Sequence, residues 1–277
     1  MAGNSLVGKL IRITSDWVDI QWSVLTGSLK EVAPRARGRL LDVGCGNKPY
    51  LDFFRPFVSE YIGIEHEATF DMTSAGGGAT RPDFVYDGVR LPFPDRSFET
   101  VLNVQVLEHT PFPQRLICEM SRVLTDDGLL ILVAPFQFRL HEQPHDYFRF
   151  SSHGLRHLCE EAGLEVVEIR PQGGMWSVIG HKLNSYLAFR VARIGSRAQA
   201  MGKLAHEPKL SQSTRIWTLP FVGVLMLFVA MVARILDPLL AEPDETMNFL
   251  ILAQRKRSAT SSRPAAEPAS PHSYPVR

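Results

Sequence analysis

Residues 39–50, RLLDVGCGNKPY, constrain the fold most, because a short apolar run is broken there by two glycines. Leu40–Val43 has the length and character of a buried parallel strand. Gly44 and Gly46 follow at once, and a glycine backbone can take a positive φ and lie against a ligand without a Cβ clash. Ligands of open α/β sheets bind beyond the carboxyl ends of the strands. The segment therefore predicts a doubly wound α/β fold with a ligand site at the glycines.

The residues after the glycines separate two classes of cofactor. A dinucleotide fingerprint needs a third glycine three positions after the second, so that a helix N-terminus meets the pyrophosphate. That position is Pro49, which disfavours an NAD-dependent oxidoreductase but leaves it as an alternative. Tyr61–Glu65 is a second apolar strand and ends in an acid, roughly twenty residues after the glycines, where a carboxylate can accept both ribose hydroxyls. We expect Glu65 to be that ribose ligand.

The order of these and later motifs resembles the class I S-adenosylmethionine-dependent methyltransferases, in particular the family that includes the ubiquinone and menaquinone methyltransferases. Asp42 begins an acid-x-Gly-x-Gly motif. The pattern continues in four later segments, residues 83–88, 91–102, 106–109 and 122–130. The resemblance covers about residues 40–170. It implies a seven-stranded doubly wound sheet with an antiparallel last strand, S-adenosyl-L-methionine as cofactor, and methyl transfer as the reaction.

The resemblance also implies a cofactor site made of strand ends and the turns after them. Asp87 is expected to receive the adenine amino group, and the backbone of Gly88 to edge the ring. Residues 103–105, at the carboxyl end of a strand over 98–104, should touch the methionine part of the cofactor through their backbone. The complete predicted set is Asp42, Gly44, Cys45, Gly46, Glu65, Asp87, Gly88, Asn103, Val104 and Gln105.

Composition bounds the remaining possibilities. The chain has 277 residues, 45% of them hydrophobic and 21% charged, enough for one catalytic domain with an appendage. A net charge of +1 with dispersed basic residues argues against a nucleic-acid partner. The three cysteines are widely spaced and frame no zinc site, so we expect a reducing compartment and no metal. The N-terminus shows no secretory signal, and a cytoplasmic protein is expected.

The chain divides into five predicted parts. Residues 1–38 form a helical segment from a cap at Ser15 to Pro34, which is either a lid over the cofactor or a helix packed on the sheet. Residues 39–170 form the cofactor-binding core, 171–244 a hydrophobic helical insertion, 245–257 the last strand of the core, and 258–277 a disordered tail. Further strands are expected at 98–104, 128–134, 164–169 and 246–253, and helices at 107–124 and 151–161.

A loop at residues 141–150, HEQPHDYFRF, concentrates the side chains suited to an acceptor pocket. A variant of its His-Asp-Tyr-Phe-Arg signature resembles methyltransferases encoded among bacterial glycan- and lipid-modifying genes. His145 is the first candidate general base and His109 the second, with Asp146 as orienter of an imidazole. The predicted acceptor-contacting residues are His141, Tyr147 and Arg149. The alternative is that the aromatic side chains fold the loop down on itself as a plug.

The insertion contains an uncharged run, Ile216–Ala233, that reaches the length of a membrane span. A single crossing would put the last strand on the opposite side of the membrane from its sheet, leaving unpaired strand edges. The run is therefore expected to lie in a membrane interface, to re-enter the membrane or to be buried in a partner, with a buried helix of the insertion itself as the alternative. We favour an interfacial position on the cytoplasmic side, through residues 216–236. The expected acceptor is a small molecule, a lipid or a lipid-linked glycan. A membrane-associated protein that keeps the cofactor fold without turnover is the other alternative.

Overall fold

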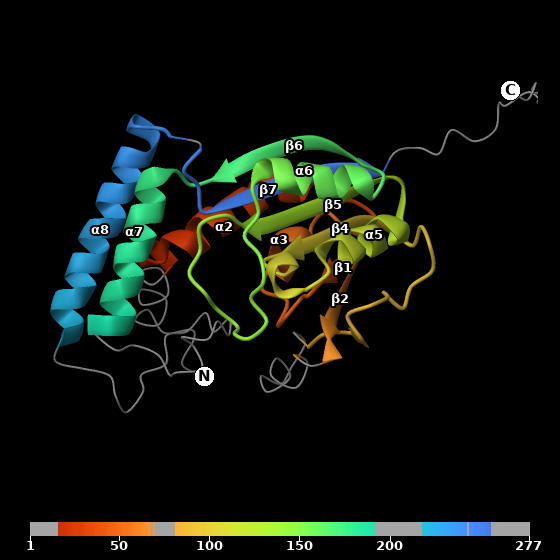
Figure 1. The fold of residues 1–277 in the computed structure, drawn as a ribbon, viewed down its shortest axis with the longest axis horizontal. Helices are drawn as coiled ribbons and strands as arrows, with labels where there is room; N and C mark the ends of the chain where they lie inside the picture. Colours follow the sequence, from red (N-terminus) through yellow and green to blue (C-terminus); the bar gives the residue numbers. More distant parts are fainter. Residues whose placement is uncertain (1–15, 68, 70–80, 192–217, 243, 256–277) are drawn as a thin grey trace, which may run out of the picture.

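The computed structural model describes residues 16–67, 69, 81–191, 218–242 and 244–255 and contains one seven-stranded sheet (Figure 1). The strands are β1 (Arg39–Val43), β2 (Glu60–His66), β3 (Phe84–Tyr86), β4 (Phe98–Val104), β5 (Leu124–Pro135), β6 (Leu164–Gln172) and β7 (Asn248–Arg255), in the spatial order β3-β2-β1-β4-β5-β7-β6. The first five are parallel, and β7 runs antiparallel between β5 and β6. The predicted fold class is confirmed.

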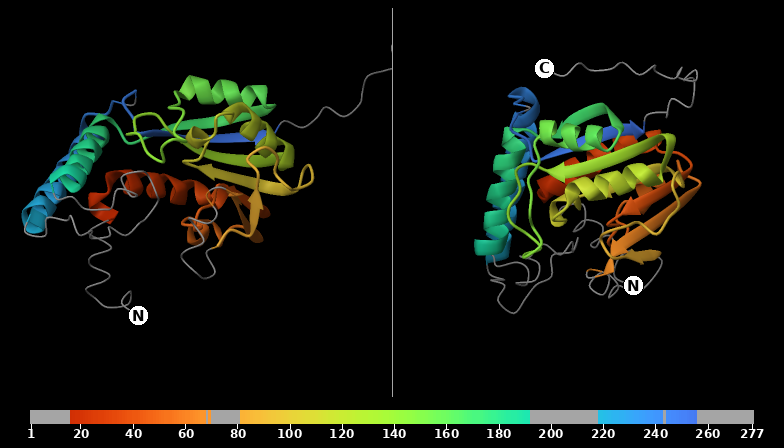
Figure 2. Two further views of the ribbon diagram at one scale, coloured as in Figure 1. Left: turned by 60° about the horizontal axis from the view of Figure 1, so that its bottom comes forward. Right: turned by 45° about the vertical axis from the view of Figure 1, so that its right-hand side comes forward.

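Helices cover both faces of the sheet (Figure 2). Helices α5 (Pro113–Val123) and α6 (Ser152–Glu161) pack on one face, and α2 (Ile20–Val32) and α3 (Leu51–Phe54) on the other. Neighbouring strand residues point to opposite faces, so Leu41 joins the first core and Leu40 the second. Burial on both faces explains why the central strands are apolar without alternation.

Helix α2 belongs to the core. Asp19 caps it by accepting a hydrogen bond from the Trp22 backbone N–H at 3.0 Å, and it ends in the 3₁₀ turn Ala33–Arg35 that contains Pro34. Its side chains Leu25 and Leu29 are buried against the sheet. In the described part of residues 1–38, α2 is therefore a helix packed on the sheet. A lid over the cofactor stays a prediction, and the predicted cap at Ser15 lies outside the described residues.

Several predicted bounds differ from the structure. The strand expected over 164–169 extends to Gln172, and the strand expected over 246–253 is Asn248–Arg255. The helix expected over 107–124 is instead a 3₁₀ turn, Leu107–His109, followed by α5. Pro111 lies between them and cannot donate a helical hydrogen bond, and Pro113 is the first residue of α5, a position that needs no such bond. Strand β5 begins at Leu124 rather than 128, because Leu124 pairs with Phe98 across a register shift. The predicted disordered tail 258–277 lies outside the described residues.

The described residues of the insertion include α7 (Met175–Tyr186), the short π-helix Leu187–Val191 and α8 (Leu219–Leu239). Helices α7 and α8 lie side by side beyond the end of the sheet (Figure 1). A Cβ on Gly180 would lie 2.7 Å from Ile20 Cδ1 and 2.9 Å from Ala233 Cβ, so α7 approaches both neighbours closely. Asp237 of α8 caps α7, accepting from the backbone N–H groups of Gly174 at 2.9 Å and Ser177 at 3.0 Å. The two helices are therefore one unit, which we call the α7–α8 hairpin.

Candidate functional site

The glycine loop after β1 has the backbone that its sequence requires. Gly44 and Gly46 have φ of 76° and 51°, the left-handed region that favours glycine. A Cβ on Gly44 would lie 2.4 Å from Val106 Cγ2, so the loop is pressed against the segment that follows β4. A Cβ on Gly46 would meet no atom within 4 Å. One side of the loop is therefore closed by protein, and the other is open to a ligand.

Glu65 lies directly beside this open side. Its side chain is buried at the carboxyl end of β2, and its Oε2 accepts a hydrogen bond from the Gly46 backbone N–H at 2.7 Å. Its Oε1 accepts from the His66 backbone N–H at 3.0 Å and from Thr69 Oγ1 at 2.8 Å. The structure thus brings together the predicted ribose ligand and the glycines, as the sequence indicated.

Asp42 lies beneath the loop in β1. Its Oδ2 accepts a hydrogen bond from the Tyr61 hydroxyl at 2.5 Å. Burial raises the pKa of Asp42 to about 7, partly offset by that hydrogen bond. Lys48, also buried, forms a 2.6 Å ion pair with Asp83. The sequence analysis did not single out this ion pair, although Lys48 lies within the glycine motif.

The other predicted cofactor residues lie at the ends of β1, β3 and β4. The Cys45 backbone N–H donates to the Ile64 carbonyl at 3.1 Å. Asp87 is exposed and accepts from the backbone N–H groups of Val89 and Arg90, which lower its pKa. A Cβ on Gly88 would lie 2.6 Å from His66 Nε2, so this turn adjoins the end of β2. The adenine role of Asp87 and Gly88 stays a prediction.

At the end of β4 the buried side chains hold the strands together. Asn103 Nδ2 donates to the Val43 carbonyl at 3.0 Å, and Val104 is in the core. Gln105 Nε2 donates to Asn248 Oδ1 at 3.2 Å, and Gln21 Nε2 donates to the same oxygen at 3.2 Å. Asn248, from β7, and Gln21, from α2, are site-edge residues that the sequence analysis missed, because nothing local signals a contact across 143 residues.

The loop that follows β5, residues 136–150, which we call the loop over the site, is held in shape by an ion pair between two of its own residues. Arg149 donates to both carboxylate oxygens of Asp146, at 2.6 and 2.9 Å, and to the backbone carbonyls of Phe138, Arg139 and Phe148. Asp146 in turn accepts from the His141 backbone N–H at 2.8 Å. These contacts make Arg149 part of the framework of the loop, and its contact with the acceptor stays a prediction. They also lower the pKa of Asp146 to about 2, despite an opposing desolvation effect.

The histidines of this region divide into two groups. His109 and His141 face each other, with ring centroids 4.6 Å apart. His145 is exposed, and its Nδ1 lies 3.0 Å from the Tyr147 hydroxyl. The imidazole next to Asp146 is that of His141, whose Nδ1 lies 3.4 Å from Asp146 Oδ2. Catalysis by His145 or His109 and acceptor contacts by His141 and Tyr147 stay predictions.

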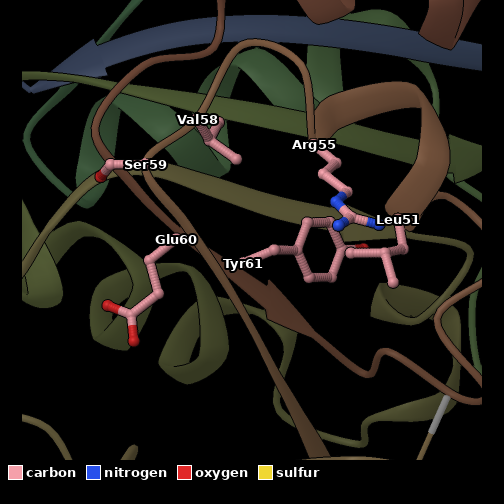
Figure 3. Close-up of a pocket in the computed structure, with 6 residues that line it drawn as sticks. All are labelled: Leu51, Arg55, Val58, Ser59, Glu60 and Tyr61. Carbon is pink, nitrogen blue, oxygen red and sulfur yellow. The ribbon is translucent and has the colours of Figure 1, made fainter. Parts of the chain in front are cut away.

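A separate surface pocket is not part of this site. It is lined by Leu51, Arg55, Val58, Ser59, Glu60 and Tyr61 (Figure 3). Glu60 begins β2, whereas Glu65 is near the end of that strand. The pocket thus lies toward the amino edge of the parallel strands, opposite the edge at which α/β sheets bind ligands.

Comparison with known protein families identifies the family to which this fold and site belong. The sequence model of a family described as a methyltransferase domain matches residues 23–169, more than half of the chain. The chain belongs to the methyltransferase domain family. Membership identifies the sheet as that of a class I methyltransferase and implies S-adenosyl-L-methionine as the cofactor. An open glycine loop with a carboxylate at the neighbouring strand end fits this cofactor. The ribose hydroxyls of the cofactor need a hydrogen-bond acceptor, and the part of the cofactor that lies on the loop needs a backbone without side chains in the way.

Curated relatives and solved structures are similar over parts of the chain. A methyltransferase of Bacillus subtilis, YcgJ, is 32% identical over 38% of this chain and 44% of its own length. One from Mycobacterium tuberculosis is 38% identical over 34% of this chain and 37% of its own. The chain thus spans less than half the length of these relatives.

Among solved structures, a methyltransferase from Archaeoglobus fulgidus has a TM-score of 0.49 at 15% identity, covering 84% of this chain and 93% of its own. A Bacillus halodurans protein described as a methyltransferase has a TM-score of 0.48 at 16% identity, and the match covers 83% of this chain and 98% of that protein.

Proposed function

We propose that this protein is an S-adenosylmethionine-dependent methyltransferase that works at the cytoplasmic surface of a membrane and takes a lipid or lipid-linked acceptor from it. The cofactor, when bound, supplies a methyl group on a positively charged sulfur. The chain's own residues position the cofactor. Glu65 accepts hydrogen bonds from its ribose hydroxyls, and the backbone of the loop at Gly44–Gly46 lies directly against it. The three cysteines are free thiols, which supports a reducing compartment.

The observation that carries the membrane part of the proposal is the exposed apolar surface of the α7–α8 hairpin. Within the described residues, α8 is the one helix long and apolar enough to cross a membrane, and most of it is not buried in the protein. Large apolar side chains that are 41% to 78% exposed run along both helices: Met175, Ile179, Leu183, Tyr186, Phe221, Val224, Leu225, Phe228, Met231, Ile235 and Leu239. Soluble monomers rarely expose a patch of this kind.

The spacing of these side chains favours a hairpin lying flat on the membrane. Phe221, Leu225, Phe228, Ile235 and Leu239 recur every three, four or seven residues, so they form one stripe along the whole of α8. Strand pairing argues against a single crossing, since Gln172 of β6 before the hairpin and Asn248 of β7 after it pair directly in the sheet. The apolar stripes instead suit burial at the boundary of headgroups and acyl chains.

The hairpin also contacts the loop over the site. Phe138 stacks on His181 of α7, with ring centroids 5.2 Å apart, and the Arg139 guanidinium lies 4.8 Å from the ring of Phe189. A membrane bound by the hairpin would therefore lie next to the loop that carries Tyr147. This adjacency supports an acceptor that reaches the site from the bilayer.

Vesicle co-sedimentation tests the membrane part. Wild type should pellet with anionic phospholipid vesicles, and the triple variant Phe221→Ser, Val224→Ser, Phe228→Ser should stay in the supernatant. Those side chains are exposed, so the fold should survive. The control variant replaces two exposed apolar residues outside the hairpin, Val89→Ser and Phe112→Ser, and should pellet like wild type. Equal behaviour of all three proteins would contradict membrane docking.

The catalytic part is tested with methyl-labelled cofactor on a lipid extract. Labelled lipid and S-adenosylhomocysteine should both form. Cofactor binding without either product would favour the non-catalytic alternative, and binding of NADH in place of S-adenosylmethionine would favour the oxidoreductase.

A further inference from the structure

Three side chains next to the loop over the site form a cluster that the cofactor does not account for. They are Glu108 and His109, in the turn after β4, and His141, after β5. One potential ligand atom from each lies within 4.8 Å of the others. Both histidine Nε2 atoms are 3.7 Å from Glu108 Oε1. These distances are too long for hydrogen bonds, so the three groups converge without bonding one another.

Glu108 is the most unusual member of the cluster. Its side chain is 0% exposed, and neither of its carboxylate oxygens has a hydrogen-bond partner. A buried carboxylate without partners is costly, and burial raises the pKa of Glu108 to about 8. The nearby cation Arg149 is bound to both oxygens of Asp146. Glu108 therefore has no side chain hydrogen-bonded to its carboxylate, the partner that buried acids ordinarily have, and the nearby charge of Arg149 only partly offsets its burial.

The two imidazoles present lone pairs to Glu108. His109 Nδ1 lies 2.8 Å from the His145 carbonyl oxygen, and His141 Nδ1 lies 3.2 Å from the Arg139 carbonyl oxygen. A carbonyl oxygen can only accept, so each Nδ1 is the protonated nitrogen and each neutral ring keeps an unprotonated Nε2. Burial lowers the pKa of both histidines, that of His141 to about 4, which favours the neutral rings. Histidine metal ligands are typically oriented through such a bond from the other ring nitrogen.

We propose that Glu108, His109 and His141 bind a divalent transition-metal ion through one carboxylate oxygen and two imidazole Nε2 atoms. Two ligand atoms 3.7 Å apart can share an ion at ordinary bond lengths of about 2.1 Å with an angle of about 120° between the bonds. Two imidazoles and one carboxylate suit Zn²⁺ or Fe²⁺ better than Mg²⁺, which prefers oxygen. This set includes no cysteine, so the spacing of the three cysteines, which argued against zinc, did not address it.

The position of the ion would also indicate which acceptors the enzyme methylates, and this part of the inference rests on the proposed function. Three protein ligands leave a coordination position free, as in catalytic rather than structural sites. Val106, which contacts the glycine loop, is two residues from Glu108. Glu142, half-buried, lies 3.7 Å from His109 Nε2 at the edge of the cluster. An ion here would bind an oxygen of the acceptor, which selects acceptors that carry a hydroxyl, carboxylate or phosphate beside the methylated atom.

Cobalt binding tests the site without relying on activity. Wild-type protein made without a histidine tag and stripped with a chelator should bind one equivalent of Co²⁺, with visible absorption bands of a histidine-containing site. Glu108→Gln and His141→Asn, both close in shape to the native residues, should each weaken Co²⁺ binding at least about tenfold. Zn²⁺ should displace Co²⁺ and raise the Tm of wild type more than that of either variant.

His157→Asn is the matched control. His157 is an exposed histidine of α6 that lies 3.4 Å from Glu161, so it offers the same chemical groups outside the cluster. This variant should bind Co²⁺ like wild type. Absence of Co²⁺ binding by wild type, or binding that Glu108→Gln and His141→Asn leave unchanged, would overturn the proposal and show Glu108 to be a protonated buried acid.

Calorimetry with S-adenosylmethionine separates this inference from the proposed function. Cobalt binding without cofactor binding would leave the metal site standing and remove the methyltransferase proposal. Cofactor binding and turnover that survive complete metal removal would remove the acceptor role of the ion.

Discussion

At the scale of single residues, Glu65 is the side chain on which cofactor affinity should depend most. It accepts a hydrogen bond from the Gly46 backbone N–H, and it is the predicted ligand of the ribose hydroxyls. Glu65→Ala should therefore weaken S-adenosylmethionine binding by about 2–4 kcal/mol, the worth of two charge-assisted hydrogen bonds. Isothermal titration calorimetry measures this loss. Glu60→Ala, at the exposed start of the same strand, should bind normally, and a loss of only a few tenths of a kcal/mol in Glu65→Ala would make Glu65 an ordinary strand end.

Asp42 should make the folding stability depend on pH. Its pKa is raised from 3.8 to about 7 in the folded protein by burial, so between about pH 4 and pH 7 the folded chain holds a proton that the unfolded chain has lost. Stability from this group therefore decreases as pH rises through that window. Asp42→Asn keeps an acceptor for Tyr61 and removes the titration.

Urea unfolding at pH 5 and pH 8 measures this effect as a difference between two proteins. The drop in unfolding free energy from pH 5 to pH 8 should be smaller in Asp42→Asn than in wild type, by at least about 1 kcal/mol. Other titrating groups, including Glu108, are common to both proteins and cancel. Identical drops would show that Asp42 is already ionised at pH 5.

At the scale of elements, the loop over the site, residues 136–150, consists of residues that hold its shape and exposed residues that can contact the acceptor. Arg149 and Asp146 hold its shape, whereas His145 and Tyr147 are exposed. His145→Ala and Tyr147→Ala should therefore lower turnover, by about 100-fold for a lost general base, and leave S-adenosylmethionine affinity nearly unchanged. Steady-state kinetics and calorimetry on the same preparations check this. If turnover and affinity fell together, the loop would contact the cofactor rather than the acceptor, and His145 would not be the general base.

Elements with strong local signals were predictable from the sequence. The strand 98–104 has the expected bounds, and Ser151 caps α6 by accepting from the Gly154 backbone N–H. Signals that depend on distant chain segments were not. The burial of Glu108 depends on a loop more than thirty residues later, and no local pattern separates a buried acid from a solvated one. For the same reason the pairing of Arg149 with Asp146 could not be distinguished from a contact with an acceptor.

At the scale of the whole molecule, the α7–α8 hairpin should control self-association. Its stripes would expose a large apolar area to water if no membrane covered them. Light scattering in detergent-free buffer should show wild type as oligomers or aggregates and the variant Phe221→Ser, Val224→Ser, Phe228→Ser as a monomer. A monodisperse, monomeric wild type without detergent would show the apolar surface to be tolerated in water.

The place of β7 between β5 and β6 has a consequence for the order of folding. β6 has β7 as its sheet neighbour, so it cannot join the sheet until residues 248–255 have been made. During synthesis the apolar hairpin emerges before those residues, while β5 still has an unpaired edge. Exposed strand edges and apolar helices are the surfaces through which nascent chains aggregate. Early capture of the hairpin by a membrane would shield one of these surfaces and hold the growing chain near its site of action until β7 closes the sheet.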